Sequence, residues 1–177
     1  MKLVWDQSDC TLELGDLTIQ AAPRDYPPFH YQAIVQEQDT NLLLSEQTTL
    51  REPGKPAWYL ANTLERTESY SLGTIILKGH DPKRLLAIVH DIEQTPTCSP
   101  EVIKLAYNNL FKIIETKHIS SLAIPLLGTV YGKLRVNESI DLLRESLQQD
   151  LPACLNKVWL ILPEDYDCSC LKQLSLN

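Results

Sequence analysis

The chain has 177 residues, of which 44% are hydrophobic and 22% are charged, and its formal net charge is −7. This length suits one domain over 1–177, and the composition excludes a disordered chain, a collagen-like repeat and a coiled coil. Nucleic acid and anionic membrane surfaces are not expected partners, because binding them requires clustered Lys and Arg. No apolar run approaches the about 18–20 residues of a membrane helix. No signal peptide is evident either, so the predicted location is cytoplasmic.

Short runs of apolar and β-branched residues mark the predicted strands. These are expected at Lys2–Trp5, Thr11–Leu14, Ala33–Gln36, Thr74–Lys78, Leu85–His90, Leu122–Leu126 and Lys157–Leu162. Two of them, at 85–89 and 158–162, are apolar at every position, which is typical of central strands covered on both faces. The polar stretch Gln36–Lys55 ends in a Pro-Gly-Lys-Pro turn and predicts a long surface loop.

Predicted helices alternate with the later strands. An N-cap serine and a proline at the first helical position predict a helix from Ser99 to about Lys117, and a second is expected over Asn137–Gln149. A weaker helix is expected over Trp58–Arg66 and a short one near Cys168–Leu174. From residue 85 onward the order is strand, helix, strand, helix, strand, which predicts a parallel sheet with right-handed crossovers.

The five cysteines do not form a recognisable pattern. Their number is odd and they are scattered along the chain. We therefore do not expect a disulfide framework, and we expect the thiols to be reduced. The Cys168-Ser169-Cys170 pair lacks both a partner pair and the about two to four intervening residues of zinc sites. We therefore expect no metal and no cofactor.

A loop bracketed by two glycines follows the predicted strand Leu122–Leu126. It reads Gly128-Thr129-Val130-Tyr131-Gly132. Glycine permits positive φ and close backbone approach, so successive N–H groups of such a loop can face a phosphate. Ligands of open α/β sheets bind beyond the carboxyl ends of the strands, where this loop is expected. An ordinary strand-to-helix turn would also explain the glycines, and the sequence leaves both interpretations open.

The order of motifs along the chain resembles the macro domain family over about residues 11–163. The motifs are Leu14-Gly15-Asp16-Leu17-Thr18, then Ala33-Ile34-Val35, a strand ending at His90, Ala123-Ile124-Pro125 and the glycine loop. The resemblance implies a three-layer α/β/α sandwich with a mixed, largely parallel sheet. It also implies binding of ADP-ribose or a related nucleotide, and some members of the family hydrolyse ADP-ribosyl esters.

The resemblance assigns ligand contacts by motif. Asp16 would accept a hydrogen bond from the adenine amino group, and the Leu17 N–H would face the ring. The glycine loop would wrap the diphosphate, with Tyr131 near the distal ribose, and Tyr166 is the nearest aromatic residue that could cover adenine. The ligand-binding residues expected on this basis are Asp16, Leu17, Asp39, Gly128, Thr129, Val130, Tyr131, Gly132 and Tyr166.

The chain also departs from the family pattern. Gln36-Glu37-Gln38-Asp39 stands where the family has Asn-Ala-Ala-Asn, Asn41–Glu46 replaces a Gly-Gly-Gly-Val stretch, and the phosphate loop is one glycine short. Glu37 and Asp39 are expected in a solvated loop, and His90 is expected to be a packed histidine. No catalytic residue is predicted. Three hypotheses remain: a nucleotide-binding module, a weak hydrolase with Asp39 as base, and a scaffold that contacts other proteins. The sequence does not indicate an oligomeric state.

Overall fold

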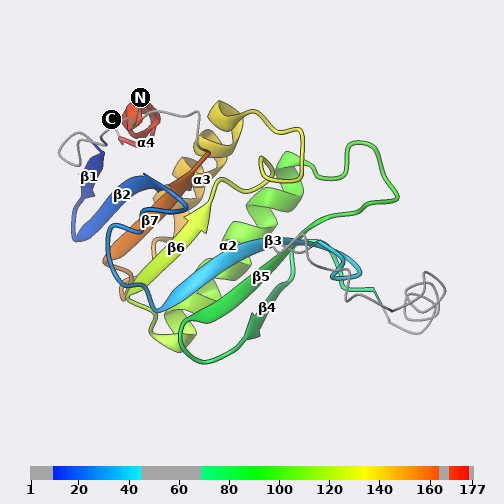
Figure 1. Ribbon diagram of the computed structural model, residues 1–177, viewed down its shortest axis with the longest axis horizontal. Helices are drawn as coiled ribbons and strands as arrows, with labels where there is room; N and C mark the ends of the chain where they lie inside the picture. The colour runs from blue at the N-terminus through cyan, green and yellow to red at the C-terminus, as the bar shows by residue number, and fades with distance from the viewer. Residues whose placement is uncertain (1–9, 45–68, 164–167, 176–177) are drawn as a thin grey trace.

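The computed structural model describes residues 10–44, 69–163 and 168–175. Its strands are β1 (Thr11–Leu14), β2 (Leu17–Pro23), β3 (Ala33–Asp39), β4 (Ile75–Lys78), β5 (Lys83–His90), β6 (Ser121–Pro125) and β7 (Lys157–Leu162). They form a mixed sheet in the order β1-β2-β7-β6-β3-β5-β4 (Figure 1). The five central strands are parallel, and β1 and β4 are antiparallel at the two edges. The expected α/β class with a largely parallel sheet is confirmed.

Two long helices, α2 (Pro100–Lys117) and α3 (Val136–Asp150), lie on the same face of the sheet (Figure 1). The predicted start of α2 is confirmed, because the Ser99 side chain accepts a hydrogen bond from the Val102 N–H and Pro100 occupies the first turn. A short 3-10 helix, η2 (Cys168–Cys170), and α4 (Leu171–Leu174) follow the last strand. No helix among the described residues is long and apolar enough to cross a membrane.

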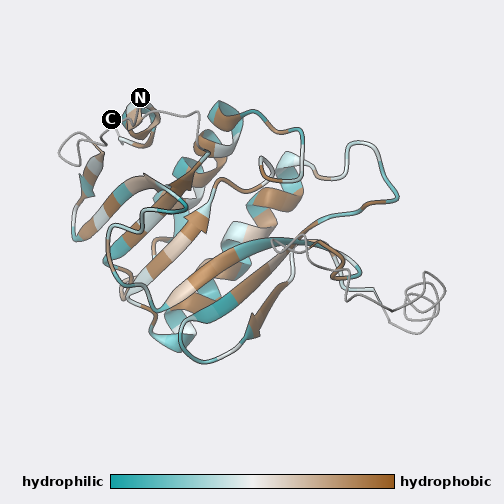
Figure 2. Ribbon diagram, viewed as in Figure 1, coloured by the Kyte–Doolittle hydropathy of each residue, from teal (hydrophilic) through white to brown (hydrophobic). Residues whose placement is uncertain are grey.

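The core lies mainly between the sheet and α2 and α3. Alternate strand positions face these helices, as in β2, where Leu17, Ile19 and Ala21 are buried (Figure 2 shows the banded hydropathy of this strand). A smaller apolar cluster lies on the other face around Trp159, where the Tyr31 ring packs at a centroid distance of 5.5 Å. The segment between β2 and β3 therefore covers part of that second face.

The strand predictions were confirmed within the described residues, with two corrections. The sequence missed β2, and it ended the third predicted strand at Gln36, whereas β3 continues to Asp39. Residues 36–39 are strand because they extend the parallel pairing of β3 with β5. The expected elements Lys2–Trp5 and Trp58–Arg66 lie outside the described residues, as does most of the expected loop Gln36–Lys55.

The expectation that all cysteines are reduced was wrong. A disulfide joins Cys10, just before β1, to Cys168 at the start of η2. It connects residues 158 positions apart, which is why spacing alone did not reveal it. Within residues 10–44, 69–163 and 168–175, no group of three or more His, Cys, Asp and Glu side chains could hold a metal ion.

Candidate functional site

The glycine loop at 128–132 lies at the carboxyl edge of the parallel strands, directly after β6. In open α/β sheets this edge is where ligands bind. The ends of β3 and β5 reach the same edge, because both run parallel to β6. The parallel arrangement of β3, β5 and β6 therefore brings together the loop, Glu37, Asp39 and His90.

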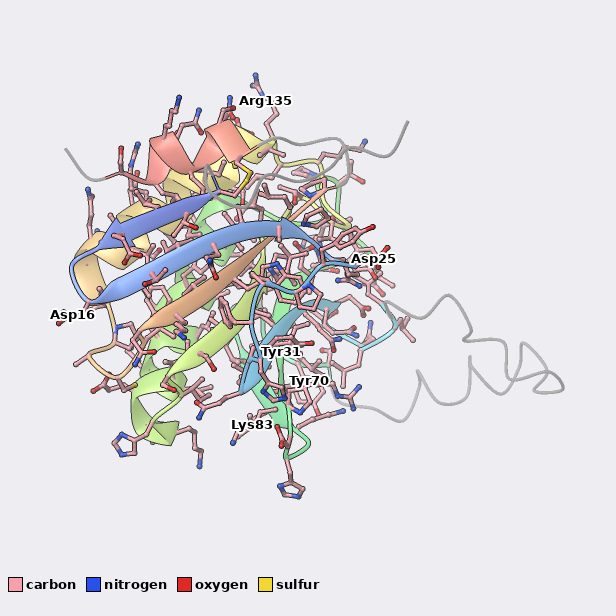
Figure 3. The ribbon with its side chains drawn as sticks, turned by 60° about the vertical axis from the view of Figure 1, so that its left-hand side comes forward. Asp16, Asp25, Tyr31, Tyr70, Lys83 and Arg135 are labelled. Carbon is pink, nitrogen blue, oxygen red and sulfur yellow. A yellow bond between two sulfur atoms is a disulfide. The ribbon has the colours of Figure 1, made fainter. Side chains whose placement is uncertain are left out.

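Asp16 and Leu17 lie at the opposite edge of the sheet. Asp16 is in the turn before β2, and Figure 3 shows it and Asp25 near opposite ends of that strand. With 7 residues in β2, the strand separates its two ends by roughly 20 Å. Leu17 is also buried, with 1% of its surface exposed. The structure therefore does not bring these two residues to the loop, and Tyr166 lies outside the described residues.

Both glycines of the loop are required by its own packing. Gly128 has a φ of +86°, which glycine adopts without strain. A Cβ on Gly132 would collide with the Gly128 carbonyl oxygen and would lie 2.7 Å from Cys98 Sγ. The Thr129 N–H and hydroxyl both donate to the Leu126 carbonyl oxygen. The conformation of the turn therefore accounts for both glycines, and no bound ligand is needed to explain them.

The inner side of the loop holds a buried acid. Glu37 Oε1 accepts a hydrogen bond from the Gly128 N–H at 2.6 Å, and Oε2 accepts one from the Tyr131 N–H at 3.3 Å. Oε2 also lies 2.6 Å from His90 Nε2. The side chains of Glu37 and His90 are 0% and 1% exposed. The prediction that Glu37 lies in a solvated loop was therefore wrong.

Strand alternation explains the position of Glu37. Ala33, Val35 and Glu37 are buried at successive alternate positions of β3, so the acid continues the core-facing row of that strand. His90 is a packed histidine, as expected, and its Nδ1 lies 3.1 Å from Thr97 Oγ1. Burial, followed by the charge of Glu37, raises the pKa of the neighbouring Cys98 thiol.

Asp39 stabilises the turn that follows β3. Its Oδ1 accepts a hydrogen bond from the Asn41 N–H and its Oδ2 accepts from Leu43 and Leu44, each at 2.7 Å. The residue is 0% exposed. Both carboxylate oxygens are thus engaged by the chain's own backbone, and the expected solvated loop around Asp39 is absent. This arrangement gives no support to the expected ligand contact.

The outer side of the loop borders a cavity of about 200 Å³. The cavity is lined by Arg24, Pro125, Leu126, Thr129, Val130, Tyr131, Ile161, Leu162 and Pro163. Val130 and Tyr131 are 46% and 36% exposed, and the Tyr131 ring meets His90 edge-on. Because sites for drug-sized ligands measure about 300–1,000 Å³, this cavity fits one ring-sized part of a ligand. Thr129, Val130 and Tyr131, three of the residues to which the resemblance assigns ligand contacts, thus line this pocket.

Comparison with known proteins identifies the fold. No family model and no curated protein matches the chain. Among solved structures, it is similar to an Oceanobacillus iheyensis macrodomain with ADP (TM-score 0.67, 18% identity, 93% of each chain covered). It is also similar to the macrodomain of Mycobacterium tuberculosis DarG (TM-score 0.59, 18% identity, 82% of this chain and 98% of that chain). The chain therefore has the macro domain fold, a three-layer α/β/α sandwich, as the sequence predicted.

Proposed function

We propose that this chain binds ADP-ribose or a related nucleotide in the cavity beside the 128–132 loop. The observation that carries the proposal is the cavity itself, which opens at the carboxyl edge of the sheet between the loop and the ends of β6 and β7. The similar O. iheyensis structures include one with ADP and one with ADPR. Fold and cavity thus support the same class of ligand.

The cavity lining suits a ring with polar edges. Pro125, Ile161 and Leu162 offer apolar surface, against which a base or a sugar can pack. Arg24 adds a guanidinium, which suits the anionic or carbonyl oxygens of a nucleotide. Thr129, Val130 and Tyr131 of the loop complete the lining.

A thermal-shift screen with ADP-ribose, ADP, AMP and NAD tests the proposal. A ligand at 100 times its Kd stabilises the fold by about 2.7 kcal/mol, which should raise the Tm by several degrees. Val130→Trp should fill the cavity and abolish this shift. Ile92→Trp is the matched control, because Ile92 is also 46% exposed but does not line the cavity. A chain that binds none of the four compounds would overturn the proposal and favour a scaffold that contacts proteins.

Efficient ADP-ribosyl hydrolysis is not expected of this site. The hydrolase hypothesis relies on Asp39 as base, and both Asp39 oxygens accept backbone hydrogen bonds in a fully buried turn. A misplacement of about 1 Å can cost roughly 100-fold in rate. Release of ADP-ribose from an ADP-ribosylated peptide should therefore stay at the background rate. Robust turnover that is lost in Asp39→Asn would restore the hydrolase hypothesis.

A further inference from the structure

Most backbone donors of the glycine loop are already used inside the protein. The N–H groups of Gly128 and Tyr131 donate to Glu37, and the Thr129 N–H donates to the Leu126 carbonyl oxygen at 3.2 Å. A backbone N–H makes one good hydrogen bond, so these three groups cannot also hold a ligand phosphate. The expected wrapping of a diphosphate by the loop therefore conflicts with the observed bonding.

Glu37 also places a carboxylate against N–H groups of the loop to which the resemblance assigns a diphosphate. Its side chain is fully buried, and its Oε2 lies 2.6 Å from His90 Nε2. Two anions that share one donor group away from water repel each other strongly. A phosphate in the loop would have to displace Glu37 from three partners at once.

We propose that Glu37 determines ligand specificity by occupying the phosphate position of the loop. The inference rests on the proposed function and narrows it: the cavity selects the nucleoside or ribose part of the ligand, and the loop contributes no phosphate affinity. The Glu37 carboxylate oxygens accept hydrogen bonds from the Gly128 and Tyr131 N–H groups. In this role they take the place that the oxygens of a ligand phosphate would have.

Calorimetry with adenosine, AMP, ADP and ADP-ribose tests this role. The wild type should bind adenosine and ADP with affinities within about tenfold of each other. Glu37→Ala removes the acid and frees two N–H donors, so it should raise ADP affinity relative to adenosine by at least about tenfold. Glu93→Ala is the control for net charge, because it removes an acid from an exposed position.

A second variant keeps the test decisive if Glu37→Ala does not fold, which circular dichroism would reveal. Glu37→Gln keeps the size of the side chain and removes its charge. It should raise ADP affinity relative to adenosine in the same direction, but by less, because the amide still fills the space. An unchanged ratio of ADP to adenosine affinity in every folded Glu37 variant would overturn the inference.

The outcomes also separate this inference from the proposed function. If the wild type binds ADP more than about tenfold tighter than adenosine, and Glu37 variants keep that ratio, the inference fails and the proposed function stands. If the wild type binds nothing but Glu37→Ala binds ADP, Glu37 blocks the loop outright, and both the proposed function and the specificity role that rests on it fail. If no form of the protein binds any of the four compounds, both fail.

Discussion

The two sides of the 128–132 loop differ in almost every physical property. On the inner side, backbone N–H groups donate to Glu37, which is buried with His90 at 0% and 1% side-chain exposure. On the outer side, Val130 is 46% exposed and borders a cavity. One short segment therefore has a side that stabilises the fold and a side that is exposed beside a cavity.

The difference follows from access to water. A buried polar group that loses its partner keeps the full cost of leaving water, about 1–3 kcal/mol and more for a charge. A surface side chain that changes has water as its replacement partner, so the free energy of unfolding moves little. Substitutions on the inner side should therefore lower stability, and those on the outer side should change binding alone.

The largest expected effect is on the inner side, in His90→Ala. Removing the imidazole leaves the Glu37 carboxylate buried without its 2.6 Å partner, which should lower the free energy of unfolding by about 3–5 kcal/mol. Urea denaturation followed by circular dichroism measures the loss. His80→Ala, at an exposed turn position, should change stability by less than about 0.5 kcal/mol. Equal effects of the two variants would mean that the buried pair contributes nothing.

The next largest effect is expected in Gly132→Ala. The new Cβ would meet the Gly128 carbonyl oxygen and Cys98 Sγ, and a backbone atom cannot rotate away. The cost should be about 3 kcal/mol, near the upper end of overpacking. Gly15→Ala is the matched control, because its Cβ meets nothing within 4 Å and only its φ of +61° is strained, at about 1 kcal/mol. A smaller loss in Gly132→Ala than in Gly15→Ala would contradict the tight packing of the inner side.

Elements with local signals were predictable from the sequence. A few neighbouring residues suffice to predict β5 and β7, because both are continuous apolar runs. The same holds for the start of α2 at Ser99-Pro100. β2 was missed although Leu17, Ile19 and Ala21 are buried at alternate positions, the pattern that indicates a half-buried strand. The two-residue turn between Leu14 and Leu17 was a hairpin signal that could have revealed the strand.

The inner side of the loop could not be predicted in the same way. Glu37 meets Gly128 across 91 residues and His90 across 53, so no local pattern relates them. An acid after an apolar strand is ordinarily solvated. The available signal was the alternation of Ala33, Val35 and Glu37, which places the acid on the core face if the strand continues. On the outer side, the glycines predicted a loop after β6 at the carboxyl edge of the sheet, but they did not predict the pocket beside it.

A smaller effect is expected in Thr97→Val, which removes the hydroxyl 3.1 Å from His90 Nδ1 and keeps the shape of the side chain. Losing this side-chain hydrogen bond should cost about 1 kcal/mol. The same change in a His90→Ala background should cost less, because the partner is already gone, and this double-mutant cycle isolates the bond. Additive losses in the cycle would show that Thr97 acts independently of the buried pair.

The smallest effect on stability is expected on the outer side, in Val130→Ala. Val130 is 46% exposed and borders the cavity, so the free energy of unfolding should change by less than about 0.5 kcal/mol. Binding should change more, because a ligand in the cavity loses contact with two methyl groups at about 0.8 kcal/mol each, up to roughly tenfold in affinity.

Urea denaturation and calorimetry on the same preparation measure both quantities. A loss of stability comparable to that of His90→Ala would mean that the outer side is also part of the core. An unchanged affinity for every adenine compound that binds would place the ligand away from Val130.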